Sequence, residues 1–144
     1  MKKYIALILM LVSCACFSQD YRTNREKGIP LSDDWVLVSG TDDFRSFVNK
    51  RTIKIRGSIR DAWILNDYKK TQPFNNGKAI LKYKSDKNLI QFMCNSREMT
   101  STSTTAYAGS YGSGKVIASY NNYHRSSVIP DTVGEAYYEY VCSQ

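Results

Sequence analysis

The residues of this chain that are able to carry out chemistry are few, and their spacing does not assemble a catalytic site. His124 is the single histidine, and no Gly-x-Ser-x-Gly segment supplies the activated serine of a catalytic triad. The carboxylate pairs Asp33-Asp34 and Asp42-Asp43 lie in segments typical of turns, where solvation is their usual role. We therefore predict no catalytic residue, no metal site and no cofactor, and we expect a protein that is not an enzyme.

One segment, Gly109 to Val116, comes close to the phosphate-binding P-loop pattern. Gly109 and Gly114-Lys115 stand at the required spacing, but Val116 replaces the hydroxyl residue that binds magnesium. The residues after Lys115 predict a strand, whereas a P-loop is followed by a helix. We therefore interpret this segment as a Gly/Ser-rich loop between two strands.

Basic residues provide the candidate for ligand binding. Lys54, Arg56 and Arg60 share even positions in a segment where basic residues alternate with isoleucines. Successive side chains of a strand point to opposite faces, so this parity predicts that all three line one face. As a patch they would attract an anionic partner, and the alternative is a solvated strand face.

The N-terminal residues predict export. Lys2-Lys3 precedes an apolar run, Tyr4 to Val12, that is too short to span a bilayer, so residues 1–18 are predicted to be a signal peptide. Cleavage after Ser18 would leave Cys94 and Cys142 as an even pair in a soluble chain. The sequence Leu11-Val-Ser-Cys14 also resembles a lipobox, and lipidation of Cys14 would anchor the chain to a membrane. Both cleavage sites remain open.

The charge of the exported chain is moderately positive. The full chain carries 20 basic and 13 acidic residues, and removal of residues 1–18 leaves 18 and 13, a net charge of +5. Lipid head groups, acidic polysaccharides or acidic protein surfaces are therefore expected partners, with an ordinary solvated surface as the alternative. Nucleic acid is not expected outside the cytoplasm, and membrane contact is expected only through a lipid anchor.

The chain length is that of one domain, and its pattern predicts mainly strands. Residues 19–34 are polar and aperiodic, which indicates a flexible lead-in to a domain over 35–144. Strands are expected at 35–38, 44–48 continued by 53–55, 59–68, 79–84, 88–94, 97–107 and 115–119. Turns are expected at 40–43, 69–73, 76–77 and 85–87, and a polar connection at 121–127. About six or seven strands at hairpin spacing indicate an antiparallel sheet, with apolar residues on both faces of 59–68.

The C-terminal segment predicts a helix. Thr132 and Glu135 have the spacing of a capping box, in which each side chain accepts a hydrogen bond from a free backbone amide. Val133, Tyr137 and Val141 then recur at helical spacing on one face. The alternative is a strand, because the segment is rich in tyrosine and contains Gly134.

Several of these pieces occur together in the order of a known family. They are Trp35-Val36, Ala62–Tyr68, Tyr83–Lys87, Ile90–Cys94 with Arg97, Gly114–Val116, Val128–Pro130, and a helix with Glu135 that closes at Val141-Cys142. With these motifs the chain resembles the surface-adhesin protein E family of bacterial exported proteins over residues 35–142.

The resemblance implies an α+β fold, in which a curved antiparallel sheet carries a C-terminal helix tied down by a disulfide between Cys94 and Cys142. The residues themselves favour the same bond, since thiols oxidise after export, with two free buried thiols as the alternative. The family also implies a non-enzymatic envelope protein in the periplasm or at the cell surface, dimeric in some members. Its role would be that of an adhesin for host extracellular-matrix proteins, and the alternative is an accessory or structural lipoprotein.

Overall fold

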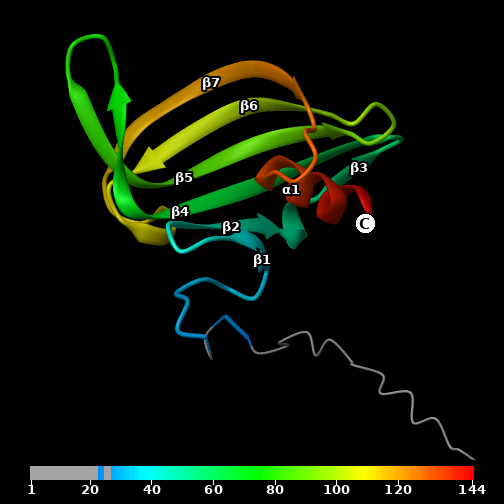
Figure 1. Ribbon diagram of the computed structural model, residues 1–144, viewed down its shortest axis with the longest axis horizontal. Coiled ribbons are helices and arrows are strands. Elements are labelled where there is room, and N and C mark those ends of the chain that lie inside the picture. The colour runs from blue at the N-terminus through cyan, green and yellow to red at the C-terminus, as the bar shows by residue number, and fades with distance from the viewer. Residues whose placement is uncertain (1–22, 25–26) are drawn as a thin grey trace, which may run out of the picture.

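The computed structural model of the chain describes Thr23, Asn24 and residues 27–144, and Figure 1 shows its arrangement. The predicted signal segment 1–18, which includes the lipidation candidate Cys14, lies outside the described residues. The described chain forms one antiparallel sheet with one helix near its C-terminus, so the predicted α+β class is confirmed.

Seven strands make up the sheet. They are β1 (Trp35–Gly40), β2 (Phe44–Asn49), β3 (Lys54–Arg56), β4 (Ile59–Asn75), β5 (Ile80–Met93), β6 (Glu98–Tyr107) and β7 (Val116–Ser127). Across the sheet the order is β1-β2-β4-β5-β6-β7, and β3 pairs with the first residues of β4. Short 3₁₀ turns at Lys50–Thr52 and Ser110–Gly112 connect β2 to β3 and β6 to β7.

The helix, α1 (Val133–Cys142), begins as its sequence predicts. Thr132 is the N-cap, and its side-chain oxygen accepts a hydrogen bond from the backbone N–H of Glu135 at 3.3 Å. The Glu135 carboxylate accepts from the backbone N–H of Asp131 at 2.8 Å, one residue before the position that the capping box predicts. Arg97 on the loop before β6 also donates to Glu135, at 2.6 Å, so the helix start is fixed to the sheet.

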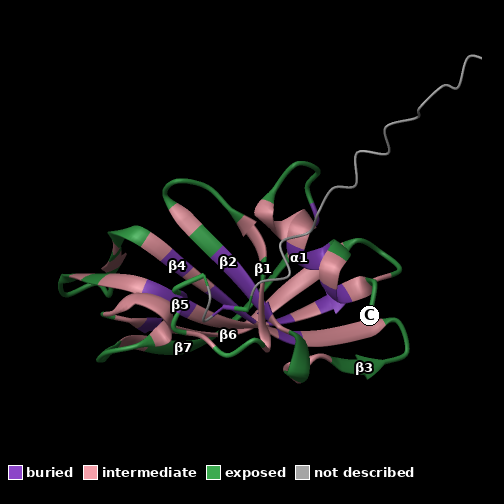
Figure 2. Cartoon of the chain, turned by 90° about the horizontal axis from the view of Figure 1, so that it is seen from below, coloured by how far each residue is buried: buried purple, intermediate pink, exposed green. Residues whose placement is uncertain are grey.

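The main core lies between α1 and one face of the sheet, which we call the helix face. Tyr137, Tyr138 and Val141 of α1 pack there against buried residues of β2, β4, β5 and the segment after β7, namely Val48, Ala62, Ile64, Ile90, Phe92 and Val128. Figure 2 shows these buried segments on the strands beneath α1. A disulfide joins Cys94 at the end of β5 to Cys142 in the last turn of α1, with Cα atoms 5.6 Å apart, as predicted. Burial of these side chains and the covalent bond hold the helix on the sheet.

The opposite face of the sheet is covered by residues 27–34, which we call the N-terminal strap. Ile29 is only 5 % exposed and packs with Phe47 and Leu65, while Leu31 lies at the edge of the same cluster. The side-chain amide of Asn24 donates to the backbone oxygens of Ser32 and Trp35, each at 2.8 Å. The described part of the predicted flexible lead-in is therefore packed, because its two isolated apolar residues cover Phe47 and Leu65.

β4 is the central strand that its sequence predicts. Ala62 and Ile64 face the helix, whereas Leu65 belongs to the cluster beneath the strap. The strand does not end at 69–73 as expected. It continues to Asn75 through an irregular stretch between Asp67 and Gln72, where its pairing with β5 shifts register. In Figure 1 the end of the β4–β5 hairpin beyond this stretch bends away from the sheet.

Two further expectations were wrong. Ser85–Lys87 is not a turn but lies within β5, where Ser85 and Asp86 are buried and paired with Asp67 and Asn66. Residues 121–127 are not a connection, because β7 extends without a break to Ser127. β7 is an edge strand whose residues are mostly exposed, so a polar sequence is compatible with strand pairing there.

Candidate functional site

The structure separates the three basic residues that the sequence places on one face. Ile55 pairs with Arg60, whereas Arg56 pairs with Ile59 across the hairpin. Directly paired residues of an antiparallel ladder point to the same face, so Arg60 lies on the face opposite to Lys54 and Arg56. The shared-face prediction is wrong because the two-residue turn at Gly57-Ser58 reverses the parity between β3 and β4.

The arginines of this hairpin are also occupied by local contacts. Arg56 forms an ion pair with Asp61 at 2.6 Å, while the Arg60 guanidinium donates to the backbone oxygen of Gly57 at 2.5 Å. Lys54 is exposed and, among residues 23–24 and 27–144, has no ion-pair partner. The β3–β4 hairpin thus presents Lys54 and Arg56 on one side, with half of their charge balanced by Asp61.

A second basic region lies at the bent end of the β4–β5 hairpin, residues 69–84, which we call the lysine arm. It contains five lysines and no acidic residue, namely Lys69, Lys70, Lys78, Lys82 and Lys84. Four of them are exposed, and Lys84 is half-buried. Sequence reasoning missed this cluster because the lysines are divided between the predicted turn at 69–73, the predicted strand at 79–84 and Lys78 between them. The signal was the complete absence of acidic residues over 16 positions.

Aromatic contacts attach the lysine arm to the rest of the sheet. Phe74 stacks on Tyr120 of β7 with ring centroids 5.8 Å apart and an interplanar angle of 17°. Tyr83 meets Tyr68 edge to face at 5.8 Å, and Tyr68 in turn lies beside Phe44 of β2. The first of these contacts joins β4 to β7, which are far apart in the sheet order, and the other two join neighbouring strands, so the arm is positioned by packing and not by its two backbone connections alone.

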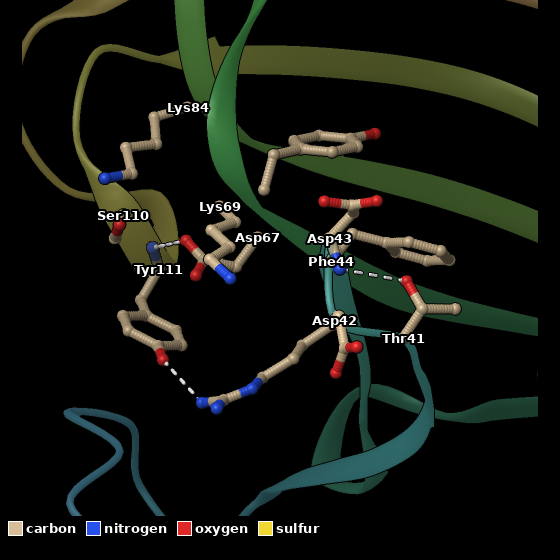
Figure 3. Close-up of a pocket in the computed structure, with 11 residues that line it drawn as sticks. Thr41, Asp42, Asp43, Phe44, Asp67, Lys69, Lys84, Ser110 and Tyr111 are labelled. Carbon is tan, nitrogen blue, oxygen red and sulfur yellow. Dashed lines mark hydrogen bonds between the residues drawn. The ribbon is translucent and has the colours of Figure 1, made fainter.

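At the base of the lysine arm lies a polar pocket of about 430 Å³, shown in Figure 3. Its lining comes from the β1–β2 turn, β2, β4, β5 and the 3₁₀ turn before β7, and consists of Thr41, Asp42, Asp43, Phe44, Arg45, Asp67, Tyr68, Lys69, Lys84, Ser110 and Tyr111. Asp67 accepts a hydrogen bond from the backbone N–H of Tyr111 at 2.7 Å, and Arg45 donates to the Tyr111 hydroxyl at 3.1 Å. The pocket thus carries charges of both signs, and two of its charged side chains, Asp67 and Arg45, are already hydrogen-bonded to Tyr111 of the 3₁₀ turn.

A row of polar side chains crosses the helix face beside this pocket. The Asn66 side chain accepts hydrogen bonds from the hydroxyls of Tyr137 and Ser46, both at 2.6 Å, and donates to Asp86 at 3.0 Å. Burial raises the pKa of the Asp86 carboxyl, and hydrogen bonds from Asn66, Asn88 and Tyr68 oppose this shift. Burial and the nearby Asp86 carboxylate raise the pKa of Tyr68, so its hydroxyl remains a donor at neutral pH. These hydrogen bonds join β2, β4 and β5 to one another and to α1.

The other residues singled out in the sequence do not form a reactive site. His124 is exposed on β7 opposite Ser101, far along the strand from any carboxylate pair. Gly109 to Gly114 forms the 3₁₀ turn and its flanks, and β7 follows, so the loop interpretation is confirmed and the P-loop is not formed. Within the part of the chain that the structure describes, no three His, Cys, Asp or Glu side chains are grouped closely enough to hold a metal ion. The same residues contain no helix long and apolar enough to cross a membrane.

Comparison with solved structures reveals the same fold in a bacterial protein. Crystal form II of Haemophilus influenzae protein E matches with a TM-score of 0.63 and 14% identity, over 78% of this chain and 90% of that chain. Protein E from non-typeable Haemophilus influenzae matches with a TM-score of 0.59 and 14% identity, over 78% of each chain. At this identity the likeness concerns the fold alone.

Sequence comparison supplies the family. No curated protein matches the chain. The family model described as Surface-adhesin protein E, by contrast, matches residues 35–143, which include the whole sheet, α1 and both cysteines of the disulfide. The chain therefore belongs to the Surface-adhesin protein E family, as its motifs suggested.

Proposed function

We propose that this protein is a non-enzymatic binding module of the bacterial cell envelope, exported to the cell surface, where it acts as an adhesin for host extracellular-matrix proteins. The observation that carries the proposal is the family match over residues 35–143. The absence of any grouped metal-ligand set among the described residues is consistent with a role in binding. The alternative, an accessory or structural lipoprotein of the envelope, uses the same fold without surface contact.

The basic residues of the β3–β4 hairpin remain the candidates for contact with a protein partner. Ile55 is 58 % exposed and pairs with Arg60, so the face of the hairpin opposite to Lys54 and Arg56 offers apolar area beside a positive charge. Exposed apolar residues rimmed by polar ones are typical of protein interaction sites. Because Arg60 lies on the other face, a partner that docks flat against the hairpin contacts either Arg60 or the Lys54 and Arg56 pair.

Binding to immobilised matrix proteins tests this proposal with two variants. We expect the double charge reversal Lys54→Glu/Arg56→Glu to weaken binding by about tenfold, because the introduced carboxylates repel the partner's anionic surface. Arg60→Glu on the opposite face is the matched comparison and should bind like the natural protein. Both variants are first checked by thermal unfolding, because Arg60 contacts its own hairpin turn. Unchanged binding by all variants would exclude the hairpin as the site.

Labelling of intact cells tests the location on which adhesion depends. A protein exposed at the cell surface reacts with a membrane-impermeant amine reagent, whereas a periplasmic protein is protected. Protection would support the accessory role and contradict adhesion. Mass spectrometry of the mature N-terminus decides separately between a lipid-modified Cys14 and a free Gln19, which we propose as the two forms of the exported chain.

A further inference from the structure

The lysine arm has a distribution of charge that the β3–β4 hairpin lacks. We propose that the lysine arm, together with the adjoining exposed part of β7, is a binding site for an acidic polysaccharide, a linear polymer that carries sulfate or carboxylate groups. This inference does not rest on the proposed binding of matrix proteins, because it concerns another hairpin and another class of partner.

The arm carries the whole net charge of the described domain. Residues 27–144 contain 16 basic and 11 acidic side chains, and the five lysines of the arm leave 11 of each sign in the remainder. The positive potential of the molecule is therefore concentrated on a projecting two-stranded ribbon. Screening by physiological salt acts over about 8 Å, so charges gathered in this way act together on a nearby anion.

The lysines of the arm are free to bind, in contrast to the arginines elsewhere. Arg51, Arg56, Arg97 and Arg125 each pair with a carboxylate. Among residues 23–24 and 27–144, no carboxylate pairs with any lysine of the arm. An anionic ligand therefore gains contact with these ammonium groups without displacing an internal partner.

The arm is also held in place before any ligand arrives. Phe74 and Tyr83 attach it to Tyr120 and Tyr68, while Lys82 is paired with Pro73 on the strands of the hairpin and is exposed. Because successive residues of a strand alternate in direction, Lys82 points away from the side on which Tyr83 packs. A ribbon that is already ordered loses little conformational entropy when it binds.

The neighbouring surface suits a sugar polymer. Tyr123 on β7 is 80 % exposed, and the side chains of Asn121 and Asn122 beside it are exposed as well. Side-chain amides donate and accept hydrogen bonds, as sugar hydroxyls require, and an aromatic ring offers a flat apolar face. Asn121 to Tyr123 directly follow Tyr120, on which Phe74 of the arm stacks, so these groups extend the proposed site on the side of the arm opposite to Lys82.

The composition of the arm favours a polysaccharide over the two other anionic partners. Interfaces between proteins are depleted in lysine and enriched in arginine, and the arm contains five lysines and no arginine. The turn at the tip consists of Asn75, Asn76, Gly77 and Lys78, and Ile80 beside it, 69 % exposed, is one apolar side chain against the continuous apolar face by which an amphipathic helix enters a bilayer. Repeated point charges along an extended ribbon match repeated anionic groups along a polymer chain.

Calorimetric titration with heparin, a sulfated polysaccharide, tests the inference on the full mature protein. The test variant is Lys70→Gln/Lys78→Gln/Lys82→Gln, which removes three exposed lysines of the arm. The matched control is Lys27→Gln/Lys50→Gln/Lys115→Gln, which removes three exposed lysines outside both proposed sites and gives the same net charge. We expect the test variant to lose at least about tenfold in affinity and to show a weaker dependence on salt, because it releases fewer counterions. The control should lose less than about threefold.

The following results would overturn the inference. Equal losses in both variants would assign binding to net charge alone, and no binding of heparin by the natural protein would leave the arm without this ligand. Binding to phosphatidylglycerol vesicles in place of heparin, lost in the test variant, would assign the arm to membranes. Loss of binding to a heparinase-treated matrix protein in the test variant would show that the arm binds a protein partner.

If the test variant keeps binding to that matrix protein but no longer binds heparin, the two proposals are separated. Equal thermal unfolding of both variants shows that folding is unaffected.

Discussion

The helix-covered end of the sheet and the lysine arm are built from the same two strands in opposite ways. Near α1, β4 and β5 carry Ile64 and Phe92, which are fully buried, and the disulfide closes the region. In the lysine arm the same strands are mostly exposed, strongly basic and attached by aromatic contacts and a backbone hydrogen bond from Lys69 to Asp43. The irregular pairing between Asp67 and Gln72 divides the two regions.

This contrast indicates a division of labour along one hairpin. The buried end supplies the free energy of folding, since burial of apolar area is the dominant favourable term. The arm contributes little to that core and is therefore free to vary in charge and shape without loss of the fold. Substitutions at the two ends should accordingly separate effects on stability from effects on binding.

The sharpest test uses two phenylalanines of the same hairpin. Phe92→Ala removes a fully buried ring from the main core and should lower the free energy of unfolding by about 3–5 kcal/mol. Phe74→Ala removes a half-buried ring whose main partner is Tyr120, and should cost only about 1 kcal/mol. Urea unfolding measures both values. Equal losses would mean that the arm belongs to the same folding unit as the core, and would break the division.

The second test concerns the covalent link at the buried end. The disulfide joins residues 48 positions apart, and its removal in Cys94→Ser/Cys142→Ser should cost about 4 kcal/mol in the chain-entropy model. The lysine arm has no such link, so its triple glutamine variant should unfold at the same urea concentration as the natural protein. Reduction of the natural protein with dithiothreitol is the control and should reproduce the loss in the serine variant. A loss below about 1 kcal/mol would show that α1 is held by packing alone.

The sequence was most informative where local chemistry decides the structure. Thr132 and Glu135 predicted the start of α1, and the predicted cleavage after Ser18 would leave Cys94 and Cys142 as a pair, which the structure joins. Apolar residues on both faces of 59–68 predicted a central strand covered on both sides, as Ala62 and Leu65 confirm. Each of these features depends on residues close in sequence or on a count of cysteines.

The predictions from sequence were wrong where contacts between residues far apart in the chain determine the structure. Ser85–Lys87 has the composition of a turn, but Asn66 satisfies Asp86 from the neighbouring strand and keeps the segment extended. The prediction that Lys54, Arg56 and Arg60 line one face was wrong because the side to which Arg60 points depends on the length of the turn before it. The lysine arm is a cluster only after the hairpin has folded and bent. The absence of acidic residues over 69–84 is a local signal for its charge, but the bend depends on contacts between distant strands.

The third test has the smallest expected effect and concerns Asp86, which lies on β5 where the two regions meet. Burial holds the pKa of this carboxyl above its ordinary value of 3.8, so the folded protein binds the proton more tightly than the unfolded chain. Ionised Asp86 therefore costs stability at neutral pH, and the cost is relieved as the pH falls through the folded pKa towards 3.8. Asp86→Asn does not titrate, so the stability of the natural protein relative to this variant should rise on acidification.

Glu135 provides a control of opposite sign in the same measurement. The backbone N–H of Asp131 and the guanidinium of Arg97 hold the pKa of Glu135 below its ordinary value of 4.5. Its contribution is therefore present above 4.5 and is lost as the pH falls through the folded pKa, so the advantage of the natural protein over Glu135→Gln should shrink on acidification. Urea unfolding at pH 7 and in mild acid measures both differences. Because one carboxylate is buried in the sheet and the other stabilises an exposed helix start, slopes of the same sign would show that Asp86 is solvated and that the polar row is open to water.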